Sequence, residues 1–334
     1  MKKFYKNKKI LILGATGFIG RNIVEYFSKK NKFDITATYF KTKPNLLNKK
    51  IKYIKIDLKN KKLVDNLLKN KEIVIQAAAV TTGSQDVIKR PYVHVADNAI
   101  MNSLLLRSCF KNQIKHFIFF SCTTMYPNSE YPVKEDDFNS KIEDNYFGAG
   151  WTKVYIEKML EFYSRISKTK FTAIRHSNIY GPYDKYDLDR SHVFGATVTK
   201  VLTSKENNFE VWGDGTEKRD LVYIDDLVKF VELIITKQKK QFELINLGSG
   251  KSISITKLVE KIIKASSKHL AIRYNNTKPT IKFNLELNID KATKKYGWKP
   301  EVCLDEGIIK TMKWYKKNIK IYDYGKISLK KCMN

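Results

Sequence analysis

The sequence predicts an α/β fold in which a doubly wound parallel sheet carries a smaller, discontinuous α/β lobe. Short β-branched runs alternate with amphipathic helical stretches through the first half of the chain, as in a parallel sheet covered on both faces. A glycine-rich turn directly follows the first apolar run. Beyond Gly181 and Pro182 the alternation loosens and loops rich in Asp, Asn and Gly separate shorter helices. We therefore expect the smaller lobe to begin there.

Each predicted strand is a short run of apolar or β-branched residues, and each predicted helix repeats apolar residues at helical spacing. In order, we expect a strand at 10–13, a helix through 24–27, strands at 35–39 and 51–56, a polar helix, a strand at 73–76, a helix at 98–110, a strand at 117–120, a helix at 151–164 and a strand at 171–175. The run from Leu221 to Asp226 and the helix after it indicate a return to the sheet. These boundaries assign 1–178 to the sheet domain, with 220–245 returning to it, and 179–219 and 246–334 to the lobe.

Length and composition are those of a globular protein. The chain has 334 residues, of which 43% are hydrophobic, and no apolar run approaches the roughly 20 residues of a membrane span. The basic N-terminus leads into the glycine-rich turn rather than a cleavage site, so we expect no signal peptide. Four cysteines without CxxC spacing predict neither a disulfide framework nor a metal site, and they suit a reducing cytoplasm.

The formal net charge of +29 raises the question of a nucleic-acid partner, because a clustered basic face attracts phosphate backbones. Lysines are instead spread along the whole chain, and no basic helix or aromatic platform repeats. We interpret the charge as a solvated surface and expect no nucleic-acid or membrane partner. Steering of an anionic substrate would be a by-product.

The run from Gly14 to Gly20 has GxxGxxG spacing between a predicted strand and a predicted helix. Such glycines allow a tight turn and let the backbone approach a pyrophosphate at the helix N-terminus. The alternative is a turn with no ligand, but strand and helix both fall where a dinucleotide site requires them. We therefore predict a dinucleotide-binding Rossmann domain. The loop residues expected at the cofactor are Gly14, Thr16, Gly17, Phe18, Ile19, Gly20 and Arg21.

The residues after the second predicted strand favour NADP over NAD. NAD enzymes usually place a carboxylate there, whereas NADP enzymes place cations. Residues 39–43 include Lys41 and no carboxylate. Because lysine is common everywhere in this chain, NAD is kept as the alternative. Further expected cofactor contacts are Lys41, Asp57, Leu58, Ala77, Ala78 and Ala79.

Motifs along nearly the whole chain resemble one family. They are the glycine loop, 121–127 (SCTTMYP), 150–153 (GWTK), 177–182 (SNIYGP), 191–193 (SHV) and 212–219 (WGDGTEKR). Together they resemble the extended short-chain dehydrogenases/reductases, the NAD-dependent epimerase/dehydratase family, and most closely its GDP-L-fucose synthase-like nucleotide-sugar enzymes. The resemblance implies a homodimer formed through helices 98–110 and 151–164. It also implies cofactor contacts by Asn98, Ser121, Lys153 and His176.

In this family a Tyr-x-x-x-Lys pair carries the proton chemistry: the lysine holds the nicotinamide ribose and lowers the tyrosine pKa, while the tyrosine exchanges a proton with the sugar oxygen. Lys153 matches the lysine, but the tyrosine position reads Ala149. Tyr146 lies about two helical turns before Lys153, so the one-turn spacing is lost. We favour an engineered Tyr-to-Ala change in an intact site over a natural chain that has abandoned or rearranged catalysis. We expect the chain with Ala149 to turn over its substrates poorly.

A Ser or Thr of the family hydrogen-bonds the same sugar oxygen, and its position here is Cys122, a poorer donor. Thr123 or Ser121 would compensate from a bulged strand end, unless these hydroxyls only cap the strand. Dehydratases of the family place an acidic residue next to this position, whereas this chain has Thr123 and Thr124. The absence of that acid disfavours 4,6-dehydration.

Two further positions bear on epimerisation. Thr124 stands where GDP-L-fucose synthase-like enzymes have an epimerising cysteine, and His192 matches their histidine. A hydroxyl is much less acidic than a thiol, which disfavours double epimerisation. His192 is left with three roles: epimerising one carbon, binding substrate, or a structural one.

The resemblance implies GDP-sugar contacts by Asn178, Val193, Lys200, Trp212 and Arg219. Arg219 and Lys200 suit a diphosphate, and Trp212 offers a flat face to base or sugar, core packing being its alternative. We therefore expect an NADPH-dependent 4-keto reductase of a GDP-sugar, with at most a single epimerisation, in surface polysaccharide precursor synthesis. The alternatives are a nucleotide-sugar 4-epimerase with bound NAD and a non-catalytic dinucleotide-binding homologue. No metal is expected.

Overall fold

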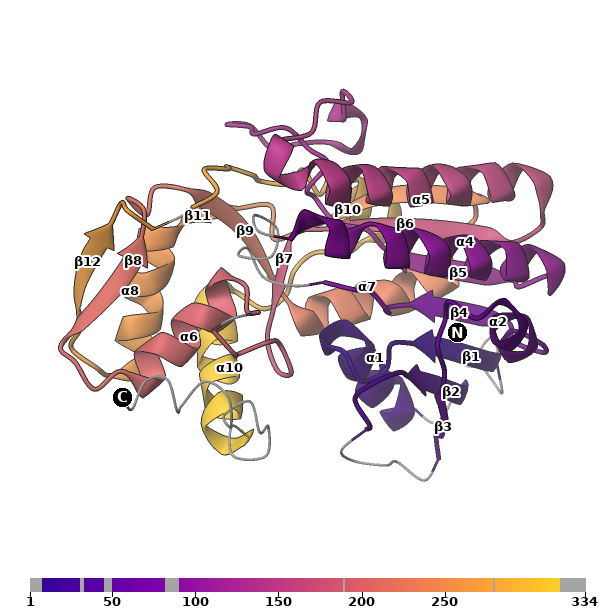
Figure 1. The fold of residues 1–334 in the computed structure, drawn as a ribbon, viewed down its shortest axis with the longest axis horizontal. Helices are drawn as coiled ribbons and strands as arrows, with labels where there is room; N and C mark the ends of the chain where they lie inside the picture. Colours follow the sequence, from indigo (N-terminus) through magenta and orange to yellow (C-terminus); the bar gives the residue numbers. More distant parts are fainter. Residues whose placement is uncertain are drawn as a thin grey trace.

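The centre of the molecule is a seven-stranded sheet in the order β10-β6-β5-β4-β1-β2-β3 (Figure 1). The computed structural model describes residues 8–30, 33–44, 50–81, 90–188, 190–278 and 280–318. Every pair of neighbouring strands in the sheet is parallel. The strands are β1 (Lys8–Leu13), β2 (Phe33–Tyr39), β3 (Lys52–Lys55), β4 (Ile73–Gln76), β5 (His116–Phe120), β6 (Lys170–His176) and β10 (Phe242–Leu247).

Alternate residues of the central strands feed two separate cores. Ile10 and Ile12 of β1 belong to one apolar cluster, and Leu11 and Leu13 belong to the other. Side chains of a strand alternate between the two faces of a sheet, so a strand buried on both faces must be apolar throughout. This pattern confirms the predicted doubly wound α/β fold.

Helices cover both faces of the sheet. One face is covered by α2, α4 and α5, whose buried residues include Val64, Leu105 and Ile156. The other is covered by α1 and α7, which pack against each other. In Figure 1 the long helices α4 and α5 run side by side above the sheet. The helix bounds are α1 (Phe18–Lys29), α2 (Lys61–Leu67), α4 (Ala96–Lys111), α5 (Phe147–Ile166) and α7 (Ile224–Lys237).

A smaller lobe lies beside the carboxyl ends of the sheet strands (Figure 1). It contains a three-stranded sheet in the order β11-β9-β7 and a two-stranded sheet of β12 and β8. Its elements are β7 (Asn178–Tyr180), α6 (Val193–Thr203), β8 (Asn208–Trp212), β9 (Lys218–Tyr223), β11 (Ser252–Ser254), α8 (Ile255–Ser266), β12 (Ala271–Asn275) and α10 (Leu304–Asn318). The helix α9 (Asp290–Tyr296) instead packs against β10 and α7. Short 3₁₀ turns are η1 (Pro91–His94), η2 (Glu135–Asp137) and η3 (Asp144–Tyr146).

The expected return of the run 221–226 to the main sheet is wrong for residues 221–223. These residues end β9, which pairs with β7 and β11 in the small sheet, and Ile224 begins α7. The strand that completes the main sheet is β10, which lies parallel to β6. A short apolar run does not specify which sheet it joins, because either sheet buries it equally well. The helix after it, α7, does pack on the main sheet. The proposed domain boundaries stay a prediction.

Within the described ranges, no helix is both long enough and apolar enough to cross a membrane.

Candidate active site

The glycine loop makes a tight turn between β1 and α1. Gly14 has φ +73°, and a Cβ added there would lie 2.6 Å from the Ala78 Cα. A Cβ added at Gly20 would lie 2.2 Å from the Gly14 carbonyl oxygen. Only glycine fits these two positions without moving the backbone. The turn brings the N-terminus of α1, with its unpaired N–H groups, to the carboxyl edge of the sheet, where a pyrophosphate fits.

Three other residues expected at the cofactor lie in different surroundings. The Arg21 guanidinium stacks on the Tyr183 ring, 3.9 Å from its centroid, and its Nε lies 3.5 Å from a Glu25 carboxylate oxygen. Lys41 is exposed just after β2. Asp57 accepts a hydrogen bond of 2.9 Å from the Lys59 backbone N–H. The remaining expected contacts (Thr16, Phe18, Ile19, Leu58, Ala77 and Ala79) stay predictions.

Asn98 has a structural task that the sequence did not indicate. Its side-chain amide donates to the Val80 carbonyl and accepts from the Val80 N–H, both at 2.9 Å. A further hydrogen bond joins it to the His94 carbonyl. The side chain is buried. Asn98 therefore fastens the segment that leaves β4, and its direct contact with a cofactor stays a prediction.

Lys153 is a residue of α5 whose side chain reaches the carboxyl end of β5. Its Nζ donates to the Phe120 carbonyl oxygen at 2.8 Å and lies 4.6 Å from the Phe119 ring centroid. Burial lowers the pKa of this ammonium, while the charges of Cys122 and Glu157 oppose the shift. An ammonium has three N–H donors, so two are left for a ligand beyond the one contact recorded among the described residues.

Ala149 lies on the same face of α5 as Lys153, one turn earlier, because residues four apart are neighbours on a helix surface. The helix begins at Phe147, four residues before the predicted start, so the register deduced from Lys153 extends through position 149. Ala149 is partly exposed. The position that should offer a phenol to the site therefore offers only a methyl group.

Tyr146 lies close to predicted site residues, a placement that the sequence did not reveal. It ends η3, just before α5, and its ring packs edge-on against Phe283 with centroids 5.9 Å apart. Burial raises its pKa, the nearby Arg219 lowers it, and Cys122 raises it. Tyr146 therefore lies within electrostatic reach of two predicted site residues. Phe283 is far from Tyr146 in the sequence, so helical spacing does not reveal this tertiary contact.

The chain segment after β5 places its polar side chains on different sides. The Cys122 Sγ lies 2.9 Å from the Thr124 Oγ1, within hydrogen-bonding distance. The Ser121 hydroxyl instead donates to the Glu157 carboxylate at 2.5 Å and is buried. Ser121 is thus not the hydroxyl that compensates for Cys122. Thr124 is the neighbour that supports the thiol, and the role of Thr123 stays a prediction.

The two histidines expected at the site are both neutral at pH 7. Burial lowers the pKa of His176 to about 4, and the charges of Lys153 and His192 add to this shift. The pKa of His192 is lowered by desolvation and by the charges of Lys185 and His94. His192 directly precedes α6 and is exposed. A neutral imidazole of this kind is able to accept a proton.

Among the residues expected at the sugar nucleotide, the structure brings Lys200 and Trp212 together. The Lys200 ammonium lies 5.0 Å from the Trp212 ring centroid, and burial lowers its pKa. The Trp212 ring is partly exposed, which argues against simple core packing. Arg219 lies near Tyr146 and donates to the Ile281 and Phe283 carbonyls.

Asn178 and Val193 are the two other expected contacts. Asn178 donates to the Asp220 carbonyl at 3.2 Å, and Val193 is the first residue of α6. Their contact with a sugar nucleotide stays a prediction.

Comparison with known proteins agrees with this architecture. The family model of the NAD dependent epimerase/dehydratase family matches residues 10–248. GDP-L-colitose synthase of Yersinia pseudotuberculosis is 28% identical over 315 residues, covering 92% of this chain and 97% of that protein. GDP-L-fucose synthase of Azorhizobium caulinodans is 28% identical over 332 residues, covering 95% and 99%. UDP-glucuronate 4-epimerase of Thermodesulfobacterium geofontis is 27% identical over 329 residues, covering 93% and 97%.

Solved structures share the fold. The UDP-glucose 4-epimerase of Thermotoga maritima, solved with UDP-glucose, superimposes with a TM-score of 0.83 at 24% identity, covering 93% of this chain and 99% of that one. Pal from Bacillus thuringiensis superimposes with a TM-score of 0.78 at 27% identity, covering 92% and 99%. Since the family model matches well over half of the sequence, the chain belongs to the NAD dependent epimerase/dehydratase family.

Proposed function

We propose that this protein binds NADPH and a GDP-linked 4-keto sugar, and that it reduces the sugar slowly because its proton donor is missing. One observation carries the proposal. Lys153 is held at the end of β5 with donors left for a ligand, while the residue one turn before it is Ala149. The lysine that should hold the nicotinamide ribose is therefore in place, whereas the tyrosine phenol that should exchange a proton with the sugar is missing.

Each part of the site has a task in this reaction. The glycine loop and the N-terminus of α1 bind the cofactor pyrophosphate, and NADPH supplies the hydride when it is bound. Lys153 holds the ribose and places a positive charge near the sugar oxygen, where negative charge develops. Cys122, supported by Thr124, donates a weak hydrogen bond to that oxygen. Arg219 and Lys200 bind the diphosphate.

Separate observations support NADPH as the cofactor and guanine as the base of the sugar nucleotide. Residues 39–44 carry Lys41 and no carboxylate, which supports NADPH over NADH. The relatives named GDP-L-colitose synthase and GDP-L-fucose synthase support a GDP-linked substrate. We place the product among precursors of surface polysaccharide. His192, neutral at pH 7, is the base for a single epimerisation if one precedes reduction.

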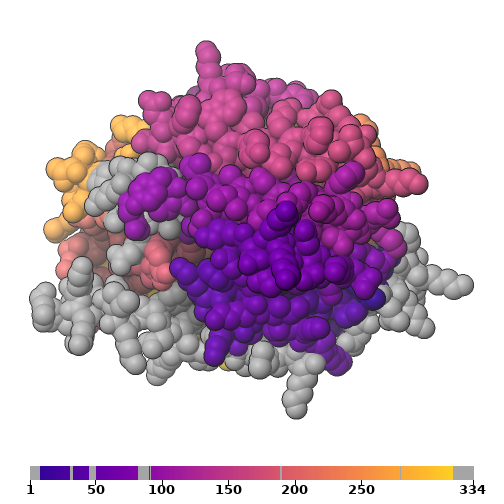
Figure 2. All heavy atoms as spheres, turned by 45° about the vertical axis from the view of Figure 1, so that its right-hand side comes forward, coloured from indigo at the N-terminus to yellow at the C-terminus, as the bar shows by residue number. Residues whose placement is uncertain are grey.

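We also propose a homodimer formed through α4 and α5. Large apolar side chains stand exposed along these two helices: Ile100, Phe110, Tyr155, Phe162 and Ile166. Figure 2 shows the purple and magenta segments that contain the helices lying open on this face of the molecule. An exposed apolar stripe on two neighbouring helices is typical of a helix-bundle interface.

A reducing compartment, the cytoplasm, suits the thiols. Cys109, Cys122 and Cys303 are free in the structure, and Cys332 lies outside the described residues. Free cysteines of this kind are typical of proteins that work where disulfides do not form.

A second function, 4-epimerisation with bound NAD, is favoured by the relative named UDP-glucuronate 4-epimerase. The two functions differ in cofactor use. Reduction consumes one NADPH for each sugar, whereas epimerisation returns the hydride and consumes none. We would measure binding of NADPH, NAD, GDP and UDP by calorimetry, and NADPH loss against product by chromatography. Binding of neither dinucleotide would overturn both functions, and epimerised product without NADPH loss would overturn the reductase.

A further inference from the structure

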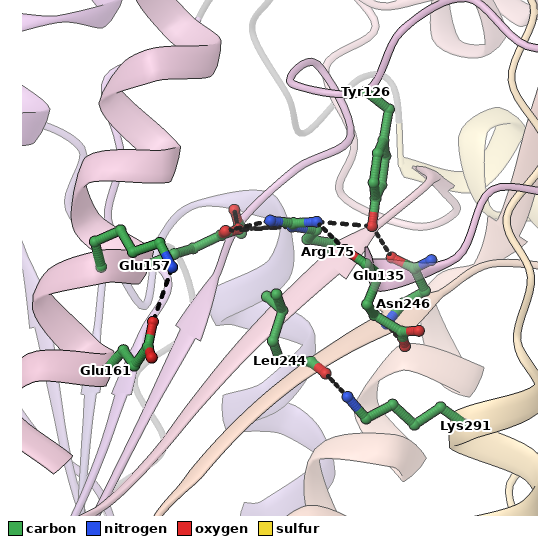
Figure 3. A network of polar contacts seen from close by, with 10 residues as sticks. Tyr126, Glu135, Glu157, Glu161, Arg175, Leu244, Asn246 and Lys291 are labelled. Carbon is green, nitrogen blue, oxygen red and sulfur yellow. Dashed lines mark hydrogen bonds and ion pairs between the residues drawn. The ribbon is translucent and has the colours of Figure 1, made fainter. Parts of the chain in front are cut away.

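A buried ion pair stands directly behind Lys153. Arg175 of β6 and Glu157 of α5 are joined by three hydrogen bonds of 2.7 to 3.2 Å, and their side chains are only 3% and 5% exposed. The same guanidinium donates to the Tyr126 hydroxyl at 2.9 Å and to the Glu135 carbonyl at 3.0 Å. The Tyr126 hydroxyl in turn donates to Asn246 of β10 at 2.7 Å (Figure 3).

This network meets the candidate site through two consecutive residues. Phe120 is the last residue of β5 and accepts from Lys153. Ser121 follows it and donates to Glu157 at 2.5 Å. Lys153 and Glu157 lie one turn apart on the same face of α5. Two successive hydrogen bonds therefore join α5 to the end of β5.

Titratable groups from three elements face Lys153. Cys122 after β5 and Glu157 on α5 favour its charged form, and His176 at the end of β6 is the third titratable group facing it. His176 is neutral above pH 7 because its pKa is depressed to about 4. Arg175 balances the Glu157 charge. Removing either partner of the ion pair therefore changes the potential at Lys153, in opposite directions.

We propose that Glu157 and Arg175 are positioning residues that hold Lys153 against β5 and fix the charge that it presents to the cofactor. This inference rests on the proposed function, in which Lys153 binds the nicotinamide ribose. Stability alone does not explain the pair, because apolar side chains often replace a buried ion pair without loss of stability.

The test is the pH dependence of NADPH binding between pH 7.5 and 10, followed by fluorescence. Lys153 contributes to affinity below its pKa, and the contribution is lost as the pH rises through it. Glu157→Gln leaves the Arg175 charge uncompensated, so the loss should begin roughly one pH unit lower. Arg175→Met leaves the Glu157 charge uncompensated, so the loss should begin at higher pH. Arg175→Lys keeps the charge and should shift the midpoint much less.

Two controls separate positioning from folding. The double variant Glu157→Met with Arg175→Met has no unpaired charge, so it should fold, return the midpoint close to that of the parent, and bind NADPH several-fold more weakly. Repeating the series in a Cys122→Ser background removes the thiol that faces Lys153. Thermal unfolding of each variant reports stability separately.

Opposite shifts in the two single variants support the inference. Shifts in the same direction, or none, overturn it. If the single variants do not fold, the double variant decides: parent-like NADPH affinity overturns the inference. If the parent chain itself binds no NADPH at any pH, the proposed function fails, and the result is distinct from a failure of the positioning role.

Discussion

Restoring a phenol at position 149 should restore turnover. Ala149 and Lys153 lie four residues apart in α5, which places their Cβ atoms about 5 to 6 Å apart on one face of the helix. A tyrosine there would lie beside a buried ammonium, whose charge lowers a phenol pKa toward the working range. Position 149 is partly exposed, so the ring has room to enter the site.

The gain follows from general acid catalysis. A positioned proton donor contributes about 10² to 10⁴-fold to a rate, which is roughly 3 to 5 kcal/mol of transition-state free energy. We therefore expect Ala149→Tyr to raise kcat by two to four orders of magnitude, with little change in the NADPH Kd. The assay is NADPH absorbance in single turnovers with a GDP-linked 4-keto sugar. Ala149→Phe is the matched control, since it adds the ring without the hydroxyl.

Equal rates for the Phe and Tyr variants would refute the reasoning, because the gain would then come from packing. An unchanged rate in Ala149→Tyr with NADPH and sugar both bound would also refute it. Tyr146→Phe tests the remaining explanation, a displaced donor. If Tyr146 supplies the proton in the parent chain, its loss removes the residual rate in the parent but not in the Ala149→Tyr background.

Three further predictions concern the loop, a buried acid and the surface. Gly14→Ala should abolish NADPH binding in a fluorescence titration, because the added Cβ meets the Ala78 backbone at 2.6 Å with φ at +73°; parent-like affinity would contradict the cofactor site. Burial raises the pKa of Asp184 to about 7, so stability should fall as pH rises from about 4 to 7, by up to roughly 4 kcal/mol. Asp184→Asn should remove this difference in stability between pH 5 and pH 8, measured by thermal unfolding. An unchanged difference would show that another group causes it. Phe162→Asp should convert the proposed dimer to monomer in light scattering, whereas a persistent dimer would move the interface away from α5.

The sheet was predictable from the sequence because both of its faces are buried. A strand such as β1 must then be apolar at every position, and its Ile and Leu residues divide between the two cores. The smaller lobe was less predictable. The run at 221–223 is as apolar as a central strand, but its partners β7 and β11 lie on either side of it in the sequence. Pairing of this kind is decided by tertiary contacts rather than by local pattern.

Some features of the candidate site were also predictable from the sequence, and others were not. The helical register from Ala149 to Lys153 was readable from the sequence, because an i, i+4 relation holds in any helix. The side to which the Ser121 side chain points was not readable from the sequence. A residue at a strand end points to whichever side its neighbours allow, and the Glu157 carboxylate reaches it only after α5 has docked on the sheet. The same docking brings Tyr146 against Phe283.

The proposed binding and proton-transfer functions depend on separate parts of the molecule. The glycine loop is shaped by backbone conformation, and Lys153 is held by the Phe120 carbonyl with the Glu157–Arg175 pair behind it. Neither arrangement involves the side chain at position 149. A methyl group there removes the proton donor and leaves every one of these contacts intact. For this reason we expect the parent chain and Ala149→Tyr to share one NADPH affinity at pH 7 while their rates differ by orders of magnitude. A large difference in affinity between them would show that position 149 also shapes the binding site.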